Sequence, residues 1–277
     1  MKKAIVIGAG FGGIAAAIRI RKKGYDVEII DRCNNLGGRA QVVELNGFKH
    51  DTGPTLITAP FLIKELFELF NKDMRTYLKL VPVNPWYRFI FSDNTFFDYE
   101  KSLEVTIKNI RKISESDANN YDKMLRASKD IYDVAFNKLA DVPFHSFLFM
   151  LKQLPSLIKF KSHKSVYSFV SQYMKSDKMR RAFSIPPLLV GGNPFTTTCI
   201  YSLIHYLERA HGVYFALGGT GKIISALGKL LTEIGVKITL NKTIEYIKIK
   251  NSIVTEIIDS NGNVDKADLY VSNMDPL

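Results

Sequence analysis

The first twenty residues, MKKAIVIGAGFGGIAAAIRI (residues 1–20), decide the fold, and three interpretations suit them. Lys2 and Lys3 precede an uncharged run with small alanines, which is typical of an export signal. The uncharged run, residues 4–18, covers about 15 residues, whereas a helix that spans a membrane needs about 20. A membrane anchor is therefore disfavoured, and an export signal and a phosphate-binding loop remain.

The spacing of the glycines separates these two interpretations. Residues 4–7 are typical of a short buried strand and residues 14–18 of a helix. Between them Gly8, Gly10 and Gly13 match G-x-G-x-x-G. In that pattern the first glycine makes a tight turn, the second admits a pyrophosphate, and the third allows close packing of helix and strand. A phosphate would face the N–H groups at the start of the helix.

The residues that follow favour the nucleotide interpretation. Lys23 and Gly24 suit the end of a helix, and residues 26–31, DVEIID, suit a second strand that ends in Asp31. This acid follows the glycines at close to the spacing of about 20 residues at which a carboxylate binds the ribose of a dinucleotide. An export signal has no need of that acid. The pattern predicts an α/β fold that begins with a Rossmann-type unit.

Length, apolar content and cysteines set further bounds. A chain of 277 residues with 46% hydrophobic residues can bury a large core in one domain or two, and it is not disordered. Its two cysteines, Cys33 and Cys199, form neither a disulfide framework nor a metal-ligand cluster. We therefore expect a reducing, cytoplasmic location and no metal site.

The charge balance points to an anionic partner. The chain has 38 basic and 27 acidic residues, a net charge of +11. Nucleic acid and phospholipid are both candidates, but no helix-turn-helix, zinc-finger or RNP pattern is present. An anionic membrane surface is favoured over nucleic acid, and a solvated basic surface without a partner stays open.

A second glycine segment follows the Rossmann-type unit. Residues 36–40, LGGRA, lead into a hairpin predicted at residues 41–50 with its turn at Asn46-Gly47, and residues 51–54, DTGP, end this region. Gly38 and Arg39 are either an ordinary turn with a solvated arginine or a place where the backbone admits the cofactor and the guanidinium pairs with its phosphates.

The middle of the chain is predicted to be helical from residue 60 to about 138, with an aromatic, strand-like interlude at residues 86–99. Residues 142–164, VPFHSFLFMLKQLPSLIKFKSHK, follow with a helical period that Pro155 is expected to interrupt. This apolar stripe suits either a buried core or a helix in a membrane interface. Its apolar and basic positions are Phe144, Phe147, Leu148, Leu151, Lys152, Lys159, Lys161 and Lys164.

The last part of the chain alternates helix and strand. The uncharged residues 182–207 are broken by prolines and glycines, and we expect two buried segments that flank a turn. A helix is predicted at residues 222–234. Strands are predicted at residues 236–240, 243–250, 252–259 and 269–271, with a hairpin turn at Asn261-Gly262.

Several of these segments together resemble the bacterial-type phytoene desaturases, which are FAD-dependent carotenoid desaturases of the flavin amine oxidase superfamily. The segments VIGAGFGGIAAAIR (6–19), NLGGRA (35–40) and DTGPTLIT (51–58) are similar to those of many flavin amine oxidases. The segment AFSIPPLLVGGNPFTTTCIYSLIHYLERAHGVYFALGGTGKI (182–223) is far more specific to the desaturases.

The resemblance implies a Rossmann-type FAD-binding domain with an interleaved substrate domain of mixed sheet and helices. Residues 1–75 and 220–277 would form the FAD-binding part, incomplete at its C-terminus, and residues 76–219 the substrate and membrane-associating region. Gly8, Gly10 and Gly13 would hold the FAD pyrophosphate, and Asp31, where the family usually has glutamate, would hold the adenosine ribose. Gly38 and Arg39 would line the phosphate and flavin side, and Ile244 would meet the adenine.

The resemblance also implies an activity: desaturation of phytoene, or a related C40 polyene, toward lycopene. The electron acceptor would be a quinone or oxygen, and the protein would lie at the inner face of the cytoplasmic membrane. A carotenoid isomerase or saturase, a C30 desaturase, and an inactive flavin-free membrane-binding fragment stay as alternatives. No catalytic residue is predicted, because the family's Arg-Asp pair and further Arg are replaced here by Leu148, Phe149 and Lys152.

The C-terminal residues 271–277, VSNMDPL, match a segment after which the family continues to a further glycine-rich stretch that closes the FAD site. The resemblance therefore implies the N-terminal part of a longer desaturase, with an exposed sheet edge near residues 269–271.

Overall fold

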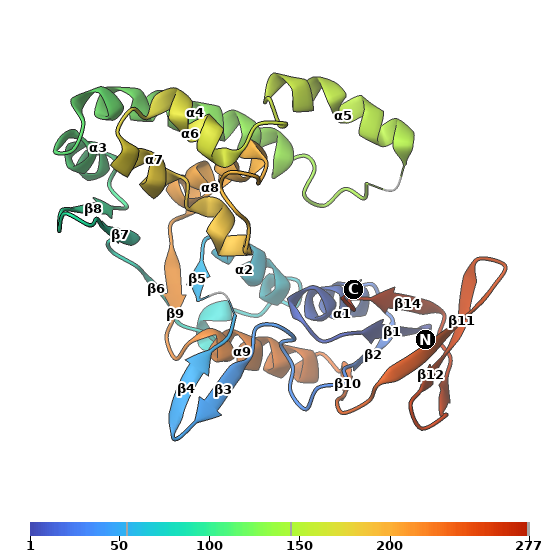
Figure 1. The fold of residues 1–277 in the computed structure, drawn as a ribbon. Helices are drawn as coiled ribbons and strands as arrows, with labels where there is room; N and C mark the ends of the chain where they lie inside the picture. The colour runs from blue at the N-terminus through green and yellow to red at the C-terminus, as the bar shows by residue number, and fades with distance from the viewer. Residues whose placement is uncertain (54, 145, 276–277) are drawn as a thin grey trace. The chain divides into compact units, whose positions relative to one another are not determined.

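The computed structural model describes residues 1–53, 55–144 and 146–275, which form two compact units. Residues 1–81 and 214–277 form the terminal unit, drawn in blue, orange and red in Figure 1, and residues 82–213 form the middle unit, mainly green and yellow. Pro54 of the DTGP segment, His145 of the residue 142–164 segment and the final residues 276–277 lie outside the described residues. The functional roles assigned to residues 1–75, 76–219 and 220–277 stay predictions.

The terminal unit is built on a four-stranded parallel sheet. Its order is β10 (Lys237–Thr239), β2 (Asp26–Ile30), β1 (Lys3–Ile7) and β14 (Leu269–Ser272), so β14 is an edge strand. The central strands are mostly apolar because parallel strands are covered on both faces, and the one buried acid in β2, Glu28, forms ion pairs with Lys3 and Lys237. Helices α1 (Phe11–Lys22) and α9 (Thr220–Glu233) contribute Ile14, Ile18 and Leu227 to the same core as Val6 and Ile29.

The rest of the terminal unit consists of short elements. The predicted hairpin is present as β3 (Val42–Leu45) and β4 (Phe48–Asp51), with Asn46 and Gly47 in the left-handed conformation that such a turn requires. The carboxylate of Asp51 then accepts from the N–H of Thr220 at 3.1 Å and so caps α9. The other elements are β5 (Leu56–Ile57), α2 (Pro60–Glu68), η1 (Met74–Thr76), β6 (Leu80–Pro82), β9 (Tyr214–Ala216), β11 (Ile244–Lys250), β12 (Ile253–Asp259) and β13 (Val264–Asp265).

The middle unit packs helices against one aromatic hairpin. The long α4 (Glu115–Ala135), capped by Ser114, packs against α8 (Leu203–His211). The hairpin is β7 (Tyr87–Ile90) and β8 (Phe96–Tyr99), within the aromatic interlude expected from the sequence. The remaining elements are α3 (Leu103–Arg111), α5 (Phe147–Lys159), α6 (Val166–Tyr173), α7 (Asp177–Phe183), η2 (Pro186–Val190) and η3 (Cys199–Ser202). None of the helices in the described part of the chain has both the length and the apolarity needed to cross a bilayer.

The sequence correctly predicts the fold class and the order strand, glycine turn, helix, strand, but one local prediction is wrong and a second holds only in part. Pro155 does not interrupt its helix, because α5 runs from Phe147 to Lys159 through it. Proline removes one hydrogen bond to the carbonyl of Leu151. Every residue of α5 for which burial is described is at least partly exposed, so water can satisfy that carbonyl and the helix continues.

The prediction for residues 182–207 holds only in part. Phe183 before the turn and Leu207 after it are buried as expected, but Leu188, Val190 and Phe195 are exposed. Two prolines start a 3-10 turn that Gly191 ends in the left-handed conformation. Such a short turn carries the side chains at its end away from the core, while the segments on both sides contribute buried residues.

Candidate functional site

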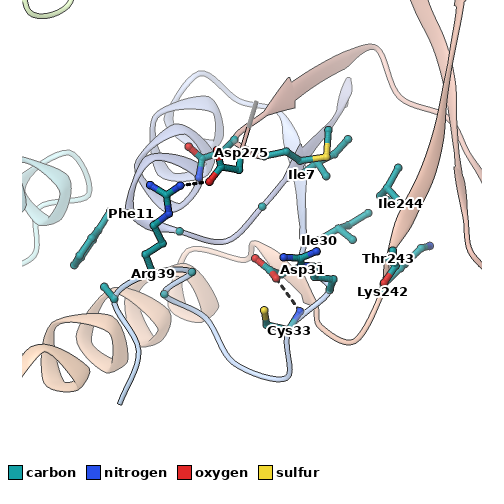
Figure 2. A pocket seen from close by; sticks show the side chains of 18 residues that line it. Ile7, Phe11, Ile30, Asp31, Cys33, Arg39, Lys242, Thr243, Ile244 and Asp275 are labelled. Atoms are coloured by element: carbon teal, nitrogen blue, oxygen red, sulfur yellow. Dashed lines mark hydrogen bonds and ion pairs between the residues drawn. The ribbon is translucent and has the colours of Figure 1, made fainter. Parts of the chain in front are cut away.

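A cavity of about 770 Å³ lies at the carboxyl ends of β1, β2 and β14 (Figure 2). Open parallel sheets bind ligands at this edge, where strand ends and the following loops meet. The lining residues come from five segments of the terminal unit: residues 7–11, 30–33, 37–40, 242–244 and 273–275.

The glycine turn forms one wall of this cavity. Gly8 adopts φ +96°, and Gly10 precedes α1 in extended conformation, with its carbonyl accepting from the N–H of Ile14 at 2.9 Å. A Cβ on Gly13 would overlap the carbonyl oxygen of Gly8. The turn thus brings the start of α1 against the end of β1, and the free N–H groups of the first helical turn are available to an anion.

Asp31 lies at the end of β2 and is 8% exposed. Its Oδ2 accepts from the N–H of Ala9 at 2.6 Å, and its Oδ1 accepts from the N–H of Cys33 at 2.8 Å (Figure 2). These two amide groups fix the carboxylate between the glycine turn and the end of β2. A carboxylate has about four acceptor positions, so it can also accept from the hydroxyls of a ribose.

The residue 36–40 segment forms the adjoining wall. The N–H of Gly37 donates to the carbonyl of Ala9 at 2.8 Å, and a Cβ on Gly38 would lie 3.0 Å from Cα of Gly10. The two glycine segments are therefore in direct backbone contact. Arg39 is exposed and forms an ion pair with Asp275 across the cavity mouth (Figure 2).

The loop before β11 lines the cavity close to Asp31. The N–H of Lys242 donates to the carbonyl of Asp31 at 2.9 Å, which places Ile244 in the lining. The ammonium of Lys242 is held by Asp265 at 2.6 Å and Asp259 at 3.5 Å, and this interaction raises the pKa of Lys242. Ile244 contributes an apolar surface, which suits contact with a flat heterocycle.

The cavity collects nearly all the residues predicted from the sequence. Gly13 is the exception: it is not part of the lining and packs beneath the turn. The predicted residues that line the cavity are Gly8, Gly10, Asp31, Gly38, Arg39 and Ile244.

Sequence reasoning missed Asn273. A Cβ placed on Gly8, Gly10 or Gly12 would meet the backbone or side chain of Asn273 within 3.2 Å, so this residue braces the glycine turn from β14. The sequence did contain a sign of this role: Asn273 directly follows an apolar strand, and the carboxyl end of that strand lies at the same sheet edge as Asp31.

A second polar cluster lies inside the middle unit and was also missed. Glu208 is 2% exposed and accepts from the hydroxyl of Tyr87 at 2.7 Å; burial raises the pKa of Glu208 to about 7. The guanidinium of Arg209 stacks over Trp86 at 4.6 Å and donates to the carbonyl of Glu100 at 2.7 Å. These contacts join α8 to the aromatic hairpin, and we assign them a structural role.

The donor set and shape of the 770 Å³ cavity fit a flavin dinucleotide. Its glycine segments are packed closely, so that a Cβ at Gly8 would meet Asn273 and one at Gly38 would meet Gly10. A helix N-terminus faces the cavity, and Asp31 offers acceptors for a ribose, so these features fit the ADP portion of a dinucleotide.

Comparison with known proteins agrees with this geometry. The chain is 39% identical over 275 residues to a lycopene-forming phytoene desaturase of Pseudescherichia vulneris, which covers 99% of this chain and 56% of that protein. It is 32% identical over 273 residues to a neurosporene-forming phytoene desaturase of Cereibacter sphaeroides, which covers 99% of this chain and 53% of that protein. The chain thus spans about half the length of the curated relatives it matches.

A structural comparison and a family comparison support the same assignment. A solved protein of Pyrococcus furiosus superposes with a TM-score of 0.65 at 17% identity, over 98% of this chain and 59% of that one. The model of the flavin-containing amine oxidoreductases matches residues 11–276, which confirms the predicted flavin cofactor, FAD. The chain therefore belongs to the family of flavin-containing amine oxidoreductases.

Proposed function

We propose that this chain forms the ADP side of the FAD site, and part of the substrate region, of a carotenoid desaturase that converts phytoene or a related C40 polyene toward lycopene. One observation carries the proposal: a glycine-walled cavity with Asp31 at its edge occurs in a chain that is similar to phytoene desaturases over 99% of its length. The apolar character expected of the substrate agrees with the aromatic content of 12%.

In this proposal each predicted site residue has a role. The backbone of Gly8 and Gly10 and the start of α1 hold the pyrophosphate, and Gly13 allows the helix to approach. Asp31 accepts from the adenosine ribose. Gly38 and Arg39 line the path toward the flavin, with Arg39 exchanging Asp275 for a phosphate, and Ile244 packs on the adenine.

The chemistry divides between cofactor and chain. When bound, FAD supplies a two-electron oxidant for the removal of hydrogens from neighbouring carbons, and a quinone or oxygen takes the electrons away. The residues of this chain bind the ADP portion and so fix its position. No residue of this chain is proposed as a catalytic base.

The proposal includes a peripheral position at the inner face of the cytoplasmic membrane, where a polyene is dissolved. Helix α5 supports it because its apolar side chains are exposed: Phe147 is 77% and Ile158 71% exposed. An amphipathic helix with basic neighbours suits a membrane interface. The other exposed apolar residues of α5 are Leu148, Met150, Leu151 and Leu154.

Nucleotide binding tests the site separately from activity. The purified chain should bind ADP and FAD competitively in calorimetry, whereas riboflavin, which lacks the ADP portion, should bind far more weakly. Asp31→Asn should weaken ADP binding about tenfold or more, and Asp26→Asn, at the exposed start of the same strand, should leave it unchanged. Equal affinity of both variants would contradict the assignment of Asp31.

Activity requires a second experiment. The chain is expressed with a source of phytoene, alone and joined to the remaining part of a relative, and the polyenes are separated by chromatography. More conjugated products support a desaturase, a product of unchanged hydrogen count indicates an isomerase, and fewer double bonds indicate a saturase; the same assay with a C30 substrate tests the C30 alternative. Vesicle binding without nucleotide binding would instead identify a flavin-free membrane-binding fragment.

A further inference from the structure

The middle unit contains a second cavity, of about 180 Å³, between α4, α6, the end of α5 and the start of η3. We propose that it binds the phosphate of an anionic phospholipid headgroup, an inference that rests on the membrane attachment proposed above. Three lysines, Lys159, Lys161 and Lys164, line it together with a single acid, Asp130.

The segment that carries the lysines is held in place by hydrogen bonds. Lys161 adopts φ +53°, so the chain reverses directly after α5. The N–H of Cys199 donates to the carbonyl of Lys164 at 2.8 Å, and the hydroxyl of Thr198 donates to the carbonyl of Ser162 at 2.7 Å. Backbone geometry, not the lysines themselves, thus forms the turn, and the three ammonium groups are left for another function.

The charges around the cavity favour an anion. No ion pair joins the ammonium group of any of the three lysines to a carboxylate in the part of the chain that the structure describes, although neighbouring Lys129 has such a pair with Asp133. Lys159 instead lies 5.5 Å from the centre of the Phe160 ring. With three cations and one acid, the lining has a net positive charge, and ammonium groups bind phosphate as point charges.

The size and the position of the cavity indicate that the phosphate belongs to a lipid headgroup. Drug-sized ligands occupy cavities of about 300 Å³ or more, so this cavity suits a small group and neither a polyene nor a dinucleotide. Ile158, directly before Lys159, is 71% exposed, and Leu154 lies one turn earlier. Apolar side chains that enter a bilayer would therefore bring the cavity to the level of the headgroups.

Flotation with vesicles tests the proposal, using phosphatidylcholine alone and phosphatidylcholine with phosphatidylglycerol. Lys161→Gln/Lys164→Gln is compared with Lys152→Gln/Lys175→Gln, which removes the same charge from exposed positions outside the cavity lining. General attraction is worth about fivefold in affinity for each lysine at an anionic surface, and both pairs would lose it equally. The proposal expects Lys161→Gln/Lys164→Gln to lose at least tenfold more affinity for anionic vesicles than Lys152→Gln/Lys175→Gln, and equal losses would overturn it.

Two further variants test the space inside the cavity and the charge of its lining separately. Ala127→Phe fills the cavity from α4 without changing charge and should weaken binding to anionic vesicles about tenfold, whereas Asp130→Asn should strengthen it several-fold. Circular dichroism and the fluorescence of Trp86, which is buried in the middle unit, confirm that each variant is folded. Unchanged vesicle binding by a folded Ala127→Phe variant would contradict the proposal.

The remaining outcomes distinguish this inference from the proposed function. If wild-type chain binds no vesicles, the membrane attachment fails as well; if it binds but the cavity variants bind equally well, only the headgroup site fails. Inorganic phosphate is the second probe, and release of the protein from vesicles by micromolar phosphate would indicate a site for free phosphate and overturn the lipid assignment. Release only at millimolar phosphate would support it.

Discussion

Asp31 in the terminal unit and Glu208 in the middle unit are buried carboxylates with opposite surroundings. Asp31 accepts from two backbone amides and lies at the edge of a cavity, whereas Glu208 accepts from one tyrosine hydroxyl. Burial alone therefore does not identify a functional acid. What separates the two is whether fixed donors orient the carboxylate while leaving acceptor positions open to a ligand.

The same contrast separates the kinds of contact that hold each acid. Backbone N–H groups hold the Asp31 carboxylate, and Gly13, Gly38 and Asn273 allow the surrounding backbone segments to pack closely. A side-chain hydroxyl holds Glu208, and the adjacent Arg209 stacks on Trp86 and Tyr99. We therefore expect substitutions near Asp31 to act through steric overlap and lost donors, and substitutions near Glu208 to act through protonation.

The largest effect is expected from Gly13→Ala, which tests whether backbone contact holds the Asp31 region. The new Cβ would overlap the carbonyl of Gly8 and should cost about 3 kcal/mol of unfolding free energy or more, with loss of ADP binding. Gly12→Ala is the matched control, because the nearest neighbours of its Cβ are side-chain atoms of Asn273, the closest being Oδ1 at 2.5 Å, and a side chain can rotate away. Chemical denaturation of both variants measures the difference, and equal costs would contradict the backbone explanation.

Glu208→Gln should have the next largest effect, and it depends on pH. The pKa of Glu208 in the folded protein is about 7, above its ordinary value of 4.5. Between these values the unfolded chain releases the proton while the folded protein keeps it, so stability falls as pH rises, by about 3 kcal/mol in total. The variant should equal wild type near pH 4 and exceed it by about that amount at pH 8.

Denaturation from pH 4 to pH 8 measures this effect through the fluorescence of the single tryptophan, Trp86, which is buried in the same unit. Glu104→Gln, at an exposed position of α3, is the control and should follow the wild-type curve. If stability changed with pH in the same way for wild type and Glu208→Gln, Glu208 would be ionised in the folded protein at neutral pH. The surroundings of Glu208 and Asp31 would then have similar effects on the two acids.

Asp31→Asn should destabilise less but impair binding. The amide NH₂ would face the N–H of Ala9 or Cys33, and one buried donor would lose its acceptor, at about 1–3 kcal/mol. At pH 8 the Asp31→Asn variant is therefore expected to be less stable than wild type, whereas Glu208→Gln is expected to be more stable. Urea denaturation measures the cost, and a stabilised Asp31→Asn variant would refute the difference between the two acids.

The smallest effect is expected at the cavity mouth. Asp275→Asn breaks the exposed ion pair with Arg39 and should change stability by less than about 1 kcal/mol. Because Arg39 becomes free for a phosphate, ADP binding should tighten two- to threefold at low salt and less at high salt. Arg39→Gln in the same titration should weaken binding, and if neither variant alters it, Arg39 has no phosphate role.

The predictability of the two acids from sequence follows from the range of the contacts that bury them. Asp31 could be placed because strand, glycine turn and helix are local, and their spacing has one geometric solution. Glu208 could not, because its burial depends on α8 meeting the aromatic hairpin, and Tyr87 is 121 residues away along the chain. Asn273 was missed for the same reason, although the strand before it was predicted.

Exposure was the property that sequence patterns predicted least well. Apolar residues in α5 and η2 suit a core by composition, yet Phe147 and Leu188 are exposed. A helical period indicates that one face is apolar but not what covers it. The small cavity beside Lys161 likewise depends on a turn and on four separate elements, α4, α5, α6 and η3, which no local pattern specifies.

The pairing of β1 with β14 has a consequence for how the chain is made. Lys3 donates to Asp268 at 2.7 Å, and the turn at Gly8 packs on Asn273. At ribosomal rates of about 5–20 residues per second, the first strand waits roughly 10–50 seconds for this neighbour. The apolar segment at residues 4–7 therefore stays uncovered on that side until residues 269–272 have been made, and a chaperone that bound it in this interval would protect it.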